Sequence, residues 1–178
     1  MKLMFASDIH GSAYYCKKLL EAFDKEQPDK LLLLGDILYH GPRNDLPRDY
    51  APKEVITMLN EMKRDIICVR GNCDTEVDQM VLEFPILSDY ALIYADGIEM
   101  LASHGHKELP PIKRGGVVLS GHTHVPKFEV IDYTAYMNPG SVSIPKEGSK
   151  NGYMIYENKS FSWYDIDGNR LKSPRKEP

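Results

Sequence analysis

The fold of this chain is decided by the stretch Gly116-Val117-Val118-Leu119-Ser120-Gly121-His122-Thr123-His124. Its apolar half is short and rich in valine, which is typical of a buried strand. The last four residues then lie on the loop that leaves the carboxyl end of the strand. Two imidazoles at positions i and i+2 reach neighbouring points only where the backbone is irregular. Because imidazole is a common metal ligand, the stretch indicates a metal site at a strand end.

The composition of the chain is that of one folded domain. Its 178 residues are enough for a sizeable core, and the apolar and charged fractions, 42% and 27%, are ordinary. No apolar run approaches the roughly 20 residues that cross a bilayer, and polar side chains follow the amino terminus too soon for a signal peptide. We therefore expect a single domain over residues 1–178, with a polar tail, 172–178, that frays.

Net charge and cysteine content bound the partners and the compartment. The formal charge of −4 argues against a large nucleic-acid interface. The three cysteines, Cys16, Cys68 and Cys73, have no Cys-x-x-Cys spacing, so neither a disulfide framework nor a structural zinc site is expected. These features predict a cytoplasmic protein without a membrane partner, and they leave open a homo-oligomer.

The chain alternates between strand and helix patterns in its first half and changes to hairpins in its second half. Strands are predicted at 2–7, 30–34 and 66–69, with helical periodicity between them. From about Phe84 onward, turn signals such as Asp96-Gly97 separate short strands. This order predicts an α/β fold in which two sheets pack face to face with helices outside.

Seven polar side chains follow the predicted strands, at the rim where open α/β sheets bind ligands. They are two carboxylates, one amide and four imidazoles: Asp8, His10, Asp36, Asn72, His104, His122 and His124. Oxygen and imidazole donors suit Mn²⁺, Fe or Zn²⁺. Seven donors are too many for one tetrahedral ion, and they suit two ions about 3.5–4 Å apart that share a carboxylate, as in phosphoester hydrolysis.

The motifs that carry these residues resemble a known family in their order. Asp8-Ile9-His10, Gly35-Asp36, Gly71-Asn72-Cys73-Asp74, Ser103-His104-Gly105-His106 and Gly121-His122-Thr123-His124 are similar to the five ordered blocks of the calcineurin-like metallophosphoesterases. Longer stretches around Asp36 and Asn72, together with 138–145, resemble the small bacterial phosphodiesterases of the YfcE type. The five blocks span about two thirds of the chain, and the closer match extends nearly to Lys146.

The resemblance implies a fold and a dinuclear metal centre. The fold would be a four-layer αββα sandwich, with two mixed sheets flanked by helices. Asp8, His10 and His124 would hold the first divalent ion, Asn72, His104 and His122 the second, and Asp36 would bridge the two. The ions are expected to be Mn²⁺, with Zn²⁺, Fe and Ni²⁺ as alternatives. A metal-bound hydroxide would attack the phosphorus of a small or nucleotide-like phosphodiester in line.

Cys73 is a departure from many members of this family, which carry a histidine there that is thought to help protonate the leaving group. A thiol of pKa about 8.5 replaces an imidazole of pKa about 6.5 poorly, so phosphomonoesters are disfavoured. The YfcE-type relatives share this cysteine. The catalytic candidates are therefore Cys73 itself, which could equally be an inert buried residue, and His106; His40 or a bound water could also supply the proton.

The loop after Asp36 holds the substrate-binding candidates, His40, Arg43 and Asn44. Arginine suits phosphate oxygens, although in a Gly-Pro loop Arg43 and Asn44 could equally fix the shape of the loop. Asp74 is more simply a structural anchor than a ligand.

Three functions remain in competition. The first is a metal-dependent phosphodiesterase, and the second is a phosphomonoesterase or pyrophosphohydrolase that uses the same ions. The third is a scaffold of the same fold without catalysis, like the retromer scaffold subunit of this superfamily. That subunit has lost histidine ligands, whereas this chain keeps every one of them.

Overall fold

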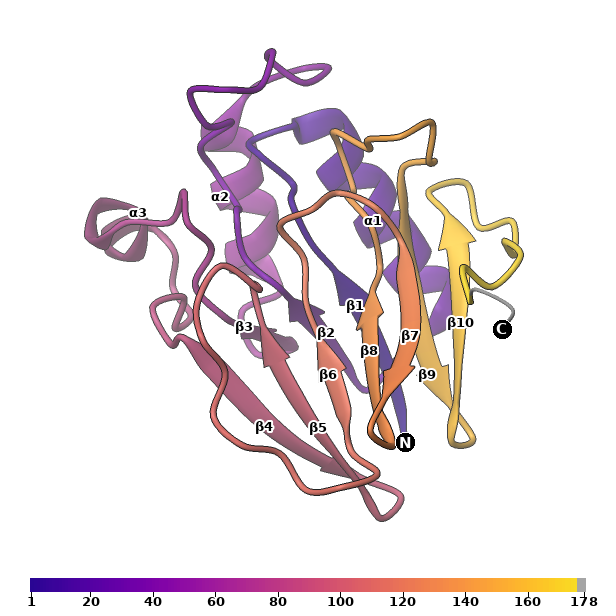
Figure 1. The fold of residues 1–178 in the computed structure, drawn as a ribbon. Coiled ribbons are helices and arrows are strands. Elements are labelled where there is room, and N and C mark those ends of the chain that lie inside the picture. Colours follow the sequence, from indigo (N-terminus) through magenta and orange to yellow (C-terminus); the bar gives the residue numbers. More distant parts are fainter. Residues whose placement is uncertain (176–178) are drawn as a thin grey trace.

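Two five-stranded sheets face each other in the computed structural model, which describes residues 1–175 (Figure 1). The first sheet has the order β10-β9-β1-β2-β3, formed by Ser160–Asp165, Gly152–Glu157, Lys2–Ala6, Lys30–Leu33 and Ile66–Cys68. The second has the order β4-β5-β6-β8-β7, formed by Tyr90–Ala95, Ile98–Ser103, Val117–Leu119, Thr134–Asn138 and Lys127–Ile131. Both sheets are mixed, because β1 is parallel to β2 and antiparallel to β9, while β5 is parallel to β6 and antiparallel to β4.

The leucine run of β2 is buried on both faces of the first sheet. Leu31 and Leu33 pack into the core beneath the helices, whereas Leu32 and Leu34 pack into the core between the two sheets. This division follows from the alternation of side chains along a strand. A strand covered on both faces reads as a continuous apolar run, as the sequence predicts.

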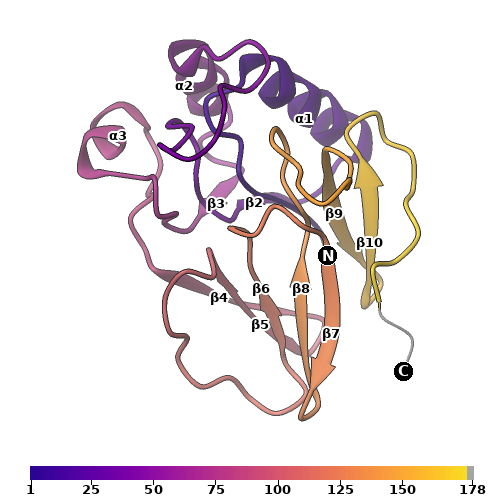
Figure 2. The ribbon, with the colours of Figure 1, turned by 45° about the horizontal axis from the view of Figure 1, so that its top comes forward.

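Helices cover the outer face of the first sheet (Figure 2). The helix α1 (Ala13–Glu26) is capped by Ser12, whose hydroxyl accepts a hydrogen bond from the backbone N–H of Tyr15 at 3.3 Å. The helix α2 (Pro52–Glu61) begins at a proline, as predicted. A short third helix, α3 (Glu76–Val81), connects the two sheets and buries none of its residues. With six residues it is too short for a helical period to stand out in the sequence.

The outer side of the second sheet carries an irregular segment, and no helix of residues 1–175 lies over it (Figure 1). The connection between β5 and β6 crosses this side, where the Lys113 backbone N–H donates to the Glu99 carboxylate at 2.8 Å. Arg114 of the same connection stacks over the ring of Tyr133, 3.9 Å from its centroid. The predicted fold class of two mixed sheets with flanking helices is confirmed, with this segment in the place of a fourth, helical layer.

The remaining expectations about the chain concern its termini and cysteines. The three cysteines are free and buried. Within residues 1–175, no helix is long and apolar enough to cross a membrane. Of the tail that we expect to fray, residues 176–178 lie outside the described part, and Arg175 forms an isolated bridge with Phe128 of β7. The single domain and the frayed tail stay predictions.

Candidate metal centre

The seven predicted ligands gather at the rim formed by the carboxyl ends of five strands. Four of them follow strands β1, β2 and β3 of the first sheet, and three follow strands β5 and β6 of the second. Most of the set is buried, His122 is half-buried and Asn72 is exposed. The site therefore spans the junction of the two sheets, with one polar edge open to solvent.

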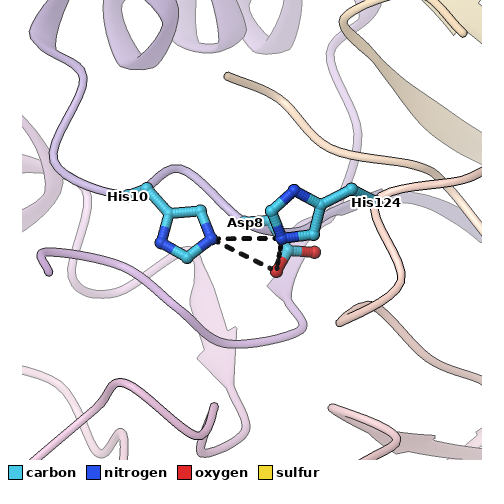
Figure 3. A group of neighbouring side chains, drawn as sticks. All are labelled: Asp8, His10 and His124. Carbon is cyan, nitrogen blue, oxygen red and sulfur yellow. Dashed lines mark hydrogen bonds and ion pairs between the residues drawn. The ribbon is translucent and has the colours of Figure 1, made fainter. Parts of the chain in front are cut away.

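Asp8, His10 and His124 form the first group, as predicted (Figure 3). The Oδ1 atom of Asp8 lies 3.2 Å from Nε2 of His124 and 3.7 Å from Nε2 of His10. The two ring nitrogens are themselves 3.3 Å apart. One oxygen and two nitrogens thus converge on a single point, which is what a shared cation requires.

Backbone carbonyls orient three of the imidazoles. Nδ1 of His10 lies 2.7 Å from the Tyr39 carbonyl oxygen, and Nδ1 of His124 lies 2.6 Å from that of Ile144. His104 makes the same contact, at 2.6 Å, with the carbonyl of Leu34. A carbonyl can only accept, so each Nδ1 carries a proton, and each Nε2 is directed at the centre of the site, where it can offer a lone pair once it is deprotonated.

Asn72, His104 and His122 form the second group. Oδ1 of Asn72 lies 2.7 Å from Nδ1 of His122 and 3.1 Å from Nε2 of His104. The rings of His104 and His122 meet edge to face, with centroids 5.1 Å apart. An amide oxygen and two imidazole nitrogens again point at one another, as the assignment to a second ion requires.

Asp36 lies between the two groups. Its Oδ2 is 3.7 Å from Nε2 of His10 and 3.4 Å from Nε2 of His104. Its Oδ1 accepts a hydrogen bond from the backbone N–H of Cys73 at 2.8 Å. The carboxylate of Asp74 in turn accepts from the backbone N–H groups of Asp36, Ile37 and Gly71 at 2.7–2.9 Å. Asp74 is therefore the anchor of this turn and does not face the cluster.

Five of the seven residues have left-handed backbone, which non-glycine residues rarely adopt. They are Asp8, His10, Asp36, His122 and His124, with φ between 50° and 67°. Such conformations persist only where the surroundings impose them, and they concentrate at functional sites. Here the imposing contacts include the hydroxyls of Ser141 and Ser143, which both donate to the carbonyl oxygen of Asp8 at 2.9 and 3.0 Å.

The donor set fits divalent cations. Oδ1 of Asp8 is buried and has no hydrogen-bond partner among the described residues, an arrangement that costs free energy unless a charge compensates it. Burial opposes the charge of Asp8, but the close imidazoles of His10 and His124 outweigh burial and hold its pKa well below the usual range. Burial also acts on His104, yet Asp36 and Asp8 raise its pKa to about 9. A cation would displace this proton.

Cys73 lies beside the cluster as a protonated thiol. Burial, followed by the charge of Asp36, raises its pKa to about 12. A thiol with that pKa is a poor nucleophile and a poor acid at neutral pH. Its sulfur also contacts the amide of Asn72 at 3.3 Å. These contacts are those of a buried packing residue, and a catalytic role for Cys73 stays a prediction.

A cavity of about 380 Å³ opens on the candidate metal centre. Its lining residues are Asp36, Gly41, Pro42, Arg43, Asn44, Asn72, Cys73, His122, Thr123, His124 and Lys146. Arg43 and Asn44 thus lie where the sequence predicts substrate contacts. Asn44 also fixes the loop, since its amide donates to the carbonyl of His40 at 2.8 Å. Lys146 was not among the predicted residues, because no motif in the sequence singles it out.

Two of the other predicted residues lie outside this lining. The ring of His40 packs between Tyr39 and Tyr50, with centroids 4.8 and 5.3 Å away. His106 is half-buried, and its ring lies edge-on to that of His104 at 5.4 Å. His106 therefore contacts the second group without lining the cavity, and its catalytic role stays a prediction.

Comparisons with known proteins agree with this geometry. Residues 1–160 match the family model of the calcineurin-like phosphoesterase superfamily domain. The phosphodiesterase YfcE of Escherichia coli strain K12 is 45% identical over 166 residues, which are 91% of this chain and 90% of YfcE. The solved structure of YfcE, a phosphoesterase from E. coli, superimposes with a TM-score of 0.93 at 43% identity and covers 97% of both chains.

A more distant structure shares the fold alone. Vps29 from Entamoeba histolytica, solved in complex with Zn²⁺, aligns with a TM-score of 0.63 at 19% identity over 96% of both chains. The predicted family and, with it, the predicted enzyme class of phosphoester hydrolase are confirmed. The chain belongs to the calcineurin-like phosphoesterase superfamily and is similar throughout to phosphodiesterase YfcE.

Proposed function

We propose that this protein is a dinuclear metal-dependent phosphodiesterase that hydrolyses small phosphodiesters. The observation that carries the proposal is the position of Asp36, whose carboxylate reaches His10 of the first ligand group and His104 of the second. A carboxylate shared between two donor groups is what a two-ion site needs. The family and the relative at 45% identity support the choice of a phosphoester as substrate.

The residues divide the work between holding ions and holding substrate. Divalent ions bound here would supply a hydroxide nucleophile at neutral pH and would offset charge on the phosphoryl oxygens. Asn72, His122 and His124 line the cavity as well as belonging to the ligand groups, so the substrate phosphate reaches the ions from this side. Arg43 lies on the same cavity, where its guanidinium can donate to an anionic group of the substrate.

A diester is favoured over a monoester because Cys73, which stands where many family members carry a histidine, is too weak an acid to protonate a poor leaving group. Cys73 lines the cavity, but its pKa of about 12 makes it a weak acid. Diesters with good leaving groups need little acid assistance. We infer Mn²⁺ as the resident ion, since carboxylate, amide and imidazole donors suit it, and we place the activity in the cytoplasm.

The experiment is hydrolysis of bis-p-nitrophenyl phosphate compared with p-nitrophenyl phosphate, with Mn²⁺ and with chelator. We expect turnover of the diester that the chelator abolishes. A preference for the monoester would instead identify a phosphomonoesterase. No turnover of either ester by protein that elemental analysis shows to be metal-loaded would favour the scaffold. The same elemental analysis, on protein purified without added metal, tests the choice of Mn²⁺.

A further inference from the structure

We propose that Arg43 and Lys146 form a second anion-binding subsite in the cavity, so that the site selects phosphodiesters that carry a further phosphate group. The proposal rests on the proposed function for the scissile phosphate and adds a substrate class to it. Both side chains line the 380 Å³ cavity onto which the metal ligands open. They come from segments about a hundred residues apart, one after β2 and the other after β8.

Hydrogen bonds fix the backbone segments that carry Lys146 and Arg43 beside the candidate metal centre. The Lys146 N–H donates to the carbonyl oxygen of the ligand His124 at 3.2 Å, and the Ser149 hydroxyl and N–H donate to the Lys146 carbonyl at 2.6 and 3.0 Å. The loop of Arg43 is closed by the Asn44 N–H, which donates to the Gly41 carbonyl at 3.4 Å. The two exposed side chains therefore start from fixed points beside the predicted ligands.

The charges of this pair are uncompensated within the described chain. Neither Arg43 nor Lys146 forms an ion pair there, whereas Lys150, four positions after Lys146, pairs with Asp165 at 3.3 Å. Asp36 is the single acidic residue of the lining, and its carboxylate is directed at the metal ligands. The cavity of a protein with a formal charge of −4 thus presents two free cations.

The combined positive charge of Arg43 and Lys146 exceeds what a simple diester needs. A phosphodiester carries one negative charge, and the proposed metal centre already faces that charge. Arginine and lysine both bind phosphate, the first as a planar fork and the second as a point charge. A cavity of this size lies within the usual range of small-molecule sites, roughly 300–1,000 Å³, so it can hold a nucleotide-sized group with a second phosphate.

The test compares two chromogenic diesters that differ only in the second phosphate. The first is the 5′-(p-nitrophenyl phosphate) ester of thymidine, and the second is the same ester with an added 3′-phosphate. For the Mn²⁺-loaded wild type we expect kcat/KM to be roughly tenfold higher for the phosphorylated ester, as charge-assisted hydrogen bonds provide. In Lys146→Gln and in Arg43→Gln the ratio of kcat/KM between the two esters should fall, mainly through KM. Lys146→Arg, which keeps the positive charge, should keep the wild-type ratio.

The matched control is Lys150→Gln, which removes the same charge from the same segment outside the cavity and should keep the wild-type ratio. Calorimetry gives a second readout, the ratio of the Kd values of thymidine 5′-monophosphate and thymidine 3′,5′-bisphosphate. Equal kcat/KM for the two esters in the wild type, or a wild-type ratio in both Lys146→Gln and Arg43→Gln, would overturn the subsite and leave the phosphodiesterase intact. Selective binding of the bisphosphate without cleavage of either ester would refute the phosphodiesterase and leave the subsite standing.

Discussion

Nε2 of His10 lies 3.3 Å from Nε2 of His124, although 114 positions separate the two residues in the sequence. Both rings direct Nδ1 to backbone carbonyls, so two lone pairs face each other beside the carboxylate of Asp8. Such an arrangement is stable only with a proton or a cation among the three groups. Protons and metal ions therefore compete for the same donors.

The first prediction concerns pH in the absence of metal. The pKa of His104, about 9, lies above the value near 6.5 expected in the unfolded chain, so the folded state binds this proton more tightly. The resulting stabilisation is complete below about pH 6.5 and is lost as the pH rises through about 9, with a size on the order of 1–3 kcal/mol. Thermal unfolding with chelator should show Tm falling by several degrees over this range.

With Mn²⁺ present, Tm should no longer fall between pH 6.5 and 9, because a bound ion keeps Nε2 of His104 deprotonated at every pH tested. His104→Asn is the control, since the side chain of asparagine does not titrate in this pH range. A Tm of the chelated wild type that rises between pH 6.5 and 9 would contradict the assignment.

The second prediction concerns the bridging carboxylate. Asp36→Ala should remove most bound metal and lower diester turnover by several orders of magnitude, because one side chain contacts both ligand groups. Asp36→Asn is the matched variant, since asparagine tolerates the left-handed backbone at φ 57° but brings no charge. Elemental analysis and bis-p-nitrophenyl phosphate hydrolysis measure both effects. An active, fully metallated alanine variant would exclude the bridging role.

The third prediction concerns Cys73. Cys73→His should raise turnover of monoester relative to diester if protonation of the leaving group is limiting. The backbone of Gly41 approaches the sulfur of Cys73 so closely that a Cβ atom at Gly41 would lie 3.2 Å from it. The larger imidazole of Cys73→His must therefore also displace the 41–44 loop. We therefore expect KM to rise for both esters. Cys73→Ser, which keeps the size of the side chain, is the control and should preserve KM. An unchanged ratio of monoester to diester turnover in Cys73→His would show that protonation of the leaving group does not set the preference for diesters.

The fourth prediction concerns Asp74, which touches no ligand atom that faces the cluster. Asp74→Ala leaves three buried N–H groups without their acceptor, at a cost of roughly 2–4 kcal/mol in the free energy of unfolding. Because one of them belongs to Asp36, metal affinity should fall as well. Denaturant unfolding of the chelated protein separates the two effects. A variant with wild-type stability but weakened metal binding would place Asp74 in the metal site itself.

Apolar runs and ordered motifs predict much of this molecule. The valine and leucine runs give strands β2 and β6 within a residue, because a strand buried on both faces leaves few polar positions. The rim of ligands follows from the same strand ends. The helix α3 is only six residues long, so its apolar spacing of Val77, Met80 and Val81 covers a single turn, and the capping box from Thr75 to Asp78 is the clearer local signal.

The site residues that sequence patterns miss are those placed by tertiary contacts. Lys146 belongs to no motif and reaches the cavity only because its segment returns to His124. His40 is close in sequence to Arg43, yet its ring packs against two tyrosines outside the cavity lining. Neighbours along a loop diverge according to packing, which a linear pattern does not encode.

The junction of the two sheets has a consequence for how this protein tolerates change. Four ligands belong to one sheet and three to the other, so the span between them is set by the apolar layer that separates the sheets. Met100, Met137 and Met154 are part of that spacer, and methionine adapts its shape to its surroundings. A substitution that thins or thickens this spacer, far from any charged group, would shift one half of the ligand set relative to the other.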